Sequence, residues 1–185
     1  MTSPAVGTNA GHRDAERSVV ARIAVTVACV AGLLHAASSL YWAVGGRWLL
    51  PTVGAWAVDA AERSPVLAGM ALGIIGLLKL SAAIVPVVIA AGRMPSPRFW
   101  RAVCWVGAVG IAVYGGVNIA VSGAVLVGVI AVAGGYDEDA MIGHVFIWDP
   151  LFFVWGVALI VWLLTSRHAG IRFDRDLNRS THHPG

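Results

Sequence analysis

Four long apolar stretches hold most of this chain, and most of its charges lie in the two tails and in the gaps between the stretches. The stretches cover about residues 19–46, 65–91, 100–134 and 141–165. The hydrocarbon core of a bilayer is about 30 Å thick, and a helix needs about 20 apolar residues to cross it. Each stretch reaches that length. The sequence therefore predicts an all-α polytopic membrane protein, an antiparallel bundle of four transmembrane helices.

The composition agrees with this class. Charged residues make up 12% of the chain, whereas a soluble domain carries about 25%. We expect four spans within a membrane domain of residues 19–166, with disordered cytoplasmic tails at 1–18 and 167–185. The segment 47–62 contains Trp48 and Trp56, which suit the headgroup layer, so we expect it to lie at the interface.

The basic residues indicate the orientation of the chain. They precede the first span, separate the second from the third, and follow the fourth: Arg13, Arg17, Arg22; Arg93, Arg98, Arg101; Arg167, Arg172, Arg175, Arg179. The other two gaps differ: one has Asp59 and Glu62 beside Arg47 and Arg63, and the other has three acids and no base, Asp137, Glu138 and Asp139. Because Lys and Arg stay on the cytoplasmic side, the sequence predicts a multi-pass protein of the cell membrane with both termini cytoplasmic. The net charge of +3 is spread over the gaps, so we expect membrane lipid and no nucleic acid as a partner.

Small residues predict which helices meet. In the third span they recur at every fourth position: Ala108, Ala112, Gly116, Ala120, Ala124, Gly128. The second span has Gly69, Gly73 and Gly76. Such patterns allow membrane helices to approach closely. We therefore expect the second and third spans to pack against each other through Gly69, Gly73, Ala112 and Gly116.

Polar residues inside the spans are the candidates for function. A charge at membrane depth costs about 2.5–3.5 kcal/mol and normally faces the bundle interior and a partner. At about 1.5 Å per residue, His35 and Asp149 lie at similar depths in the outer half. Asp149 is thus expected to pair with His35, Lys79 or Tyr114. The sequence leaves two interpretations of His144, which lies about one turn from the outer end: it is solvated there, or it meets His35 and Asp149.

These residues suggest an intramembrane pocket that opens outward. Asp149 would be its acid and His35 its base or proton shuttle. Six residues would bind a substrate: Ser39, Trp42, Tyr114, Asn118, Trp148 and Phe152. Asp59 and Glu62 would be accessory acids at its mouth. The alternative is a structural clasp, in which His35 and Asp149 only lock helices together through a buried hydrogen bond, and the sequence leaves both interpretations open.

No pattern in the chain predicts a metal or a cofactor. There is no H-E-x-x-H string, no local cluster of cysteine and histidine, no nucleotide-binding loop and no nucleophile elbow. Cys29 and Cys104 lie toward the reducing side of the membrane. We expect them to be free thiols.

Two strings resemble a known family. They are H-A-A-S-S-L-Y-W-A-V-G-G at 35–46 and W-D-P-L-F-F-V-W-G at 148–156. They are similar to the end of the first span and the start of the fourth in a small bacterial membrane family with about four spans, which is catalogued only as a domain of unknown function. The resemblance implies the architecture and points to His35, Ser39, Trp42 and Asp149, but it implies no activity.

Three functions remain. The first is acid–base chemistry on a lipophilic, isoprenoid-like substrate, for example proton-initiated terpenoid cyclisation, which requires a protonated acid, a dry cavity and aromatic faces that stabilise cations. The second is a non-catalytic membrane subunit or a lipid- or quinone-binding protein. The third is a small transporter. The pattern assigns no oligomeric state.

Overall fold

The computed structural model describes residues 6–166, and every regular element in that range is helical. In chain order the elements are α1 (Val6–Ala43), the 3-10 turn η1 (Pro51–Val53), α2 (Ala55–Arg63), α3 (Pro65–Ala90), α4 (Pro97–Leu126), α5 (Glu138–Gly143), the π-helix η2 (His144–Trp148) and α6 (Asp149–Thr165). Four segments are long and apolar enough to cross a membrane: His12–Ala43, Pro65–Ala90, Pro97–Leu126 and Glu138–Thr165. The prediction of an all-α polytopic bundle is confirmed.

The helix ends differ from the predicted spans at two places. α1 begins at Val6, whereas a disordered tail was expected as far as residue 18. No proline interrupts this stretch, and His12 and Glu16 form an ion pair one turn apart at 3.0 Å. α4 ends at Leu126, earlier than the predicted residue 134, since Gly128, the residue after the C-cap Val127, adopts a positive φ of 74°. The expected tail at 167–185 lies outside the described residues.

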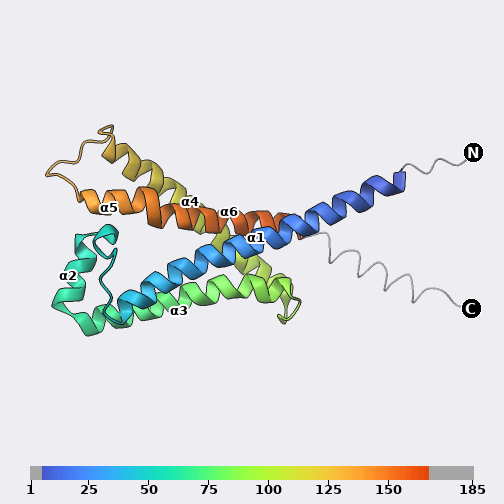
Figure 1. Ribbon diagram of the computed structural model, residues 1–185, viewed down its shortest axis with the longest axis horizontal. Helices are drawn as coiled ribbons and strands as arrows, with labels where there is room; N and C mark the ends of the chain where they lie inside the picture. The colour runs from blue at the N-terminus through green and yellow to red at the C-terminus, as the bar shows by residue number, and fades with distance from the viewer. Residues whose placement is uncertain (1–5, 167–185) are drawn as a thin grey trace, which may run out of the picture.

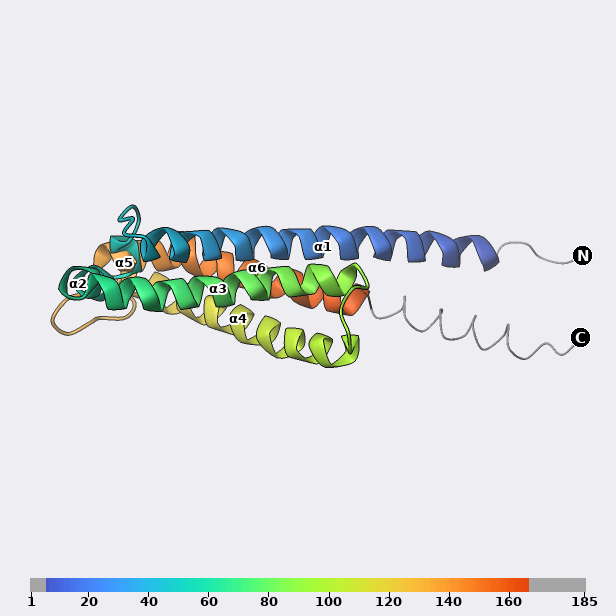
Figure 2. The ribbon, with the colours of Figure 1, turned by 90° about the horizontal axis from the view of Figure 1, so that it is seen from below.

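The four long helices pack in the order α3, α1, α6, α4. α1 lies against both α3 and α6, and α6 lies against α4, while α3 and α4 touch little (Figures 1 and 2). The expected seam between the second and third spans is therefore wrong. A Cβ on Gly69 would meet the Ala43 carbonyl of α1 at 2.8 Å, and one on Gly116 would meet the Phe153 ring of α6 at 3.4 Å. Small residues permit a close approach, but they do not select the helix that approaches.

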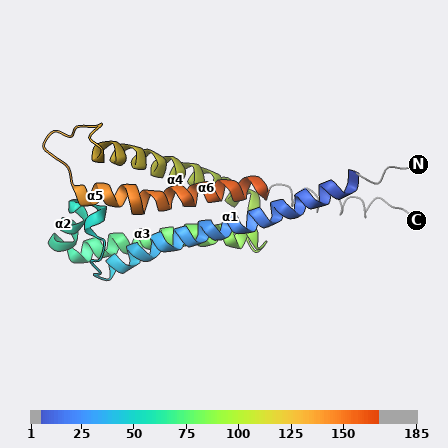
Figure 3. The same ribbon diagram turned by 45° about the horizontal axis from the view of Figure 1, so that its top comes forward.

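The chain between α1 and α3 folds over one end of the bundle. Residues 44–64, which we call the outer cap after the side of the membrane that the sequence predicts for them, contain η1 and α2. They lie at the same end as α5 and the loop before it (Figure 3). Within the cap, Leu50 is buried, whereas Trp48 and Trp56 are 74% and 69% exposed. The Ala55 N–H donates to Asp137 Oδ2 at 2.7 Å, which connects the cap to the start of α5. The cap thus shields the end of the bundle where α1 and α6 carry their polar residues.

Candidate functional site

A π-helix joins α5 to α6 and positions the acid of the site. It spans His144–Trp148, directly before Asp149 and Pro150. Pro150 has no N–H, so the usual bond to the Phe146 carbonyl cannot form. In an α-helix, residues five apart are rotated by about 140° from each other, whereas a π-helix pairs position i with i+5. The wider turn brings His144 and Asp149 to the same side.

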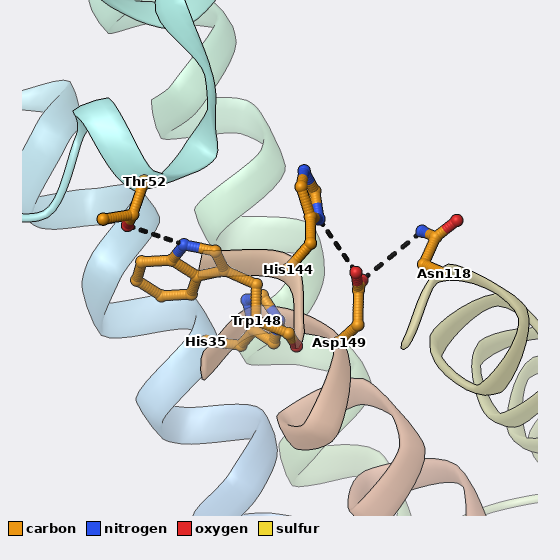
Figure 4. Close-up of polar contacts among 6 residues, drawn as sticks. All are labelled: His35, Thr52, Asn118, His144, Trp148 and Asp149. Carbon is orange, nitrogen blue, oxygen red and sulfur yellow. Dashed lines mark hydrogen bonds and ion pairs between the residues drawn. The ribbon is translucent and has the colours of Figure 1, made fainter. Parts of the chain in front are cut away.

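His144 and Asp149 form a close pair, which we call the dyad. The Nδ1 atom of His144 donates to Oδ2 of Asp149 at 2.8 Å (Figure 4). Asn118 of α4 donates through Nδ2 to Oδ1 of Asp149 at 3.4 Å. The Asp149 side chain is 1% exposed and that of His144 is 26% exposed. A buried carboxylate needs such partners because isolation from water is costly.

The expected partners of Asp149 were wrong. Asp149 hydrogen-bonds to His144 and Asn118, and within the described residues it does not bond to His35, Lys79 or Tyr114. Of the two interpretations of His144, the structure favours contact with the acid. Regular α-helical spacing places His144 and Asp149 on different faces, and only the π-helix removes that separation. The proline after Asp149 was the one signal in the sequence for an irregular helix at this point.

His35 belongs to a second polar cluster, formed with Ser39 of α1 and Lys79 of α3. The His35 Nε2 atom lies 3.1 Å from the Trp148 carbonyl, which can only accept, so Nε2 carries the hydrogen. The Nδ1 atom of His35 therefore accepts from Lys79 Nζ at 3.2 Å. Lys79 also donates to Ser39 Oγ at 3.0 Å. We call His35, Ser39 and Lys79 the lysine cluster.

The ring of Phe152 packs against the lysine cluster and against two further aromatic side chains. Its ring stacks on His35 with centroids 3.8 Å apart, and Lys79 Nζ lies 5.4 Å from its centroid. Tyr114 of α4 meets the same ring edge-on at 5.6 Å, and Trp155 stacks on it at 6.4 Å. The expected lining residues Tyr114 and Phe152 are thus in contact with each other.

Trp148 connects the site to the outer cap. Its indole N–H donates to Thr52 Oγ1 of η1 at 3.0 Å (Figure 4), and its ring meets Trp42 edge-on at 5.1 Å. The Trp42 indole in turn donates to the Trp48 carbonyl at 2.9 Å. Both tryptophans are buried, so they link the cap to the helices rather than anchoring the protein in the headgroup layer. Thr52 had no signal in the sequence.

The structure keeps the expected accessory acids at the surface. Asp59 pairs with Arg63 at 2.9 Å on the exposed side of α2. Glu62 lines a shallow depression of about 190 Å³ in the outer cap, together with Arg47, Leu50, Pro51 and Val58. Neither acid hydrogen-bonds to the dyad or to the lysine cluster within residues 6–166. In the same range no three His, Cys, Asp or Glu side chains gather as metal ligands, and Cys29 and Cys104 are free.

Comparison with known proteins identifies a family but no described relative. No curated protein and no solved structure matches the chain. A family model described as "Protein of unknown function (DUF3995)" matches residues 31–159. The match begins before His35 in α1 and ends beyond Phe152 in α6, so it includes the dyad and the lysine cluster. Since the matched region is more than half of the chain, this membrane protein belongs to the DUF3995 family.

Proposed function

We propose that this protein is an intramembrane enzyme that performs acid–base chemistry on a lipophilic, isoprenoid-like substrate. The observation that carries the proposal is the hydrogen bond of 2.8 Å between a fully buried carboxyl group, Asp149, and a partly exposed imidazole, His144. A proton-transfer residue must be held in position and must also exchange protons with its surroundings. The dyad divides these two tasks between its members.

His144 supplies the proton route. Its second ring nitrogen points away from Asp149 (Figure 4), and its side chain is 26% exposed. When Nε2 accepts a proton, the hydrogen on Nδ1 can pass to Oδ2 of Asp149. The imidazole is then neutral again and the acid is protonated. This exchange returns a proton to Asp149 without requiring the acid itself to reach water.

Asp149 is the proposed acid toward the substrate. In the cyclisation version, it donates its proton to a carbon–carbon double bond or an epoxide oxygen of the isoprenoid. The hydrogen bond from Asn118 stabilises the carboxylate that remains. The carbocation formed is stabilised by aromatic faces, for which Trp148, Phe152 and Tyr114 are the candidates. Loss of a proton from the cyclised cation to Asp149 restores the acid and releases an isomer of the substrate.

His35, which the sequence suggested as a base, has a different proposed role. It donates to the Trp148 carbonyl, the last residue of the π-helix before Asp149. We therefore assign it as a positioning residue, which holds the backbone that orients the dyad. Ser39 supports it by donating from Oγ to the His35 carbonyl at 3.3 Å.

Turnover by the purified protein in lipid nanodiscs tests the proposal. The probes are polyprenyl alcohols, the corresponding acids and phosphates, and their terminal epoxides. Chromatography separates isomeric products from the substrate, and mass spectrometry checks that their mass is unchanged. We expect Asp149→Asn to fold and to lose at least about a hundredfold in rate, in the range typical of a general acid. His144→Gln should retain a hydrogen-bond donor yet slow turnover. Asp59→Asn removes an exposed carboxyl and is the matched control. Full activity of Asp149→Asn would contradict the proposed acid–base function.

The second candidate function is a non-catalytic subunit or a lipid- or quinone-binding protein. It is favoured by the lysine cluster, whose groups bond to one another and to the Trp148 carbonyl, as a structural clasp requires. In that case no probe is converted, and Asp149→Asn and Ser39→Ala change only stability or binding. A small transporter remains the third hypothesis.

A further inference from the structure

Lys79 carries a charge within a membrane span without an acidic partner. It lies near the middle of α3, which runs from Pro65 to Ala90 and is one of the candidate spans. Its hydrogen-bond partners are the neutral groups His35 Nδ1 and Ser39 Oγ. Within residues 6–166, no Asp or Glu forms an ion pair with it. A charged side chain inside a membrane normally pairs with an opposite charge or marks a ligand site.

The lysine cluster has more donors than acceptors. An ammonium group offers three hydrogens, of which one goes to His35 and one to Ser39. Ser39 gives its own hydrogen to the His35 carbonyl, and His35 gives its Nε2 hydrogen to the Trp148 carbonyl. Each acceptor atom of the cluster thus already receives one hydrogen bond, whereas within the described residues no bond takes the third hydrogen of Lys79.

A second donor beside the cluster also lacks an acceptor. The indole N–H of Trp155 is buried, and no group within the described part of the chain accepts from it. Trp155 stacks parallel to Phe152, the ring over which Lys79 lies. A buried donor without a partner costs about 1–3 kcal/mol. Two donors without acceptors next to the Phe152 ring indicate that a bound ligand supplies an acceptor here.

We propose that the lysine cluster binds the anionic oxygen head group, a carboxylate or a phosphate, of a lipophilic ligand whose chain lies along Phe152 and Tyr114. An anion supplies both the missing acceptor and the missing countercharge, which a neutral ligand does not. Lys79 of α3 and Tyr114 of α4 approach Phe152 from two helices that touch each other little, so the ligand bridges them.

This inference rests on the proposed function only for the chain of the ligand, because it assigns the head group of the isoprenoid-like substrate. Binding to the lysine cluster does not require proton transfer by the dyad. A ligand that binds without being converted therefore supports the anion site and contradicts the enzyme, and the two proposals fail separately.

The experiment measures affinities of matched ligands for the full chain in detergent micelles by intrinsic tryptophan fluorescence. The probes are farnesoic acid, farnesyl monophosphate and farnesol, which share one chain and differ in the head group. Oleic acid and oleyl alcohol repeat the comparison on a straight chain. We expect the acid or the phosphate to bind at least about tenfold more tightly than the alcohol, since hydrogen bonds to charged groups are the stronger ones. The tighter of the two anions identifies the head group.

Three variants assign the effect to Lys79. Lys79→Met keeps the length of the side chain and should abolish the preference for the anion, whereas Lys79→Arg keeps the charge and should retain it. Arg98→Gln removes an exposed charge at the start of α4 and controls for general attraction of anions to the micelle. His144→Gln should bind the anion like the unchanged protein. Equal affinity for acid and alcohol, or an unchanged preference in Lys79→Met, overturns the proposal.

Discussion

His144 donates to Asp149 at 2.8 Å although the two residues are five positions apart in the chain. The π-helix between them makes this contact, and Pro150 directly follows the acid. Such helices are rare and often occur at functional sites. The irregular backbone thus brings the pair together, and hydrogen bonds of the Trp148 carbonyl and indole hold its last residue in place.

The first prediction concerns the coupling within the dyad. His144→Ala leaves Asp149 with only the longer bond from Asn118, and the break of a buried pair costs about 3–5 kcal/mol. Asp149→Asn on its own costs less, because the amide oxygen still accepts from His144. The double variant should be more stable than the sum of the single effects implies. Denaturant unfolding in detergent measures all four proteins, and additivity within about 0.5 kcal/mol would contradict the pairing.

The second prediction concerns the contact between α4 and α6. A Cβ on Gly115 would lie 2.6 Å from the Asp149 carbonyl and 2.8 Å from the Phe153 nitrogen, both of which are backbone atoms. Gly115→Ala should therefore destabilise the protein by about 1–3 kcal/mol, as overpacking does. Gly110 lies in the same helix with nothing within 4 Å of the added atom. Gly110→Ala should be neutral or stabilising by up to about 1 kcal/mol. Equal melting temperatures of the two variants would show that the helices do not meet at Gly115.

The third prediction concerns the attachment of the outer cap. Thr52→Val keeps the shape of the side chain but leaves the Trp148 indole N–H without its acceptor, which costs about 1–3 kcal/mol. The matched control is Thr26→Val. The Thr26 hydroxyl bonds to the Arg22 carbonyl on the exposed face of α1, so its loss should change stability little. Thermal unfolding followed by tryptophan fluorescence compares the variants. An unchanged melting temperature of Thr52→Val would show that this bond does not hold the cap to the site.

The fourth prediction concerns orientation. We propose that both termini are cytoplasmic in the cell membrane, because the basic gaps lie on one side and the acidic gaps on the other. Single cysteines at Pro95→Cys and Glu138→Cys, both exposed positions, are introduced after replacement of Cys29 and Cys104. A reagent that cannot cross the membrane should label only the cysteine at 138 in intact cells. Labelling of the cysteine at 95 before permeabilisation would show that the chain has the opposite orientation.

The helices of the fold could be predicted from the sequence, whereas the helix against which each one packs could not. The lengths of the apolar stretches led directly to four membrane helices. The glycines of α3 and α4 correctly marked close approaches, but they were assigned to the wrong partners, since Gly69 lies against α1 and Gly116 against α6. A small residue removes a steric obstacle for any neighbour. The surface that fills the space is specified by residues far away in the chain.

The sequence by itself determined that this protein crosses a membrane, how many long helices it has, and which polar residues the interior must satisfy. Hydrophobic length and the cost of charge in lipid act on each segment separately, so they can be read without a fold. Only the tertiary structure decided that Asp149 bonds to His144 and that His35 bonds to Lys79. A hydrogen bond forms only when its two atoms are placed to within a few tenths of an ångström. Those distances are set by one π-turn and by the order of packing of α3, α1, α6 and α4, which no single segment encodes.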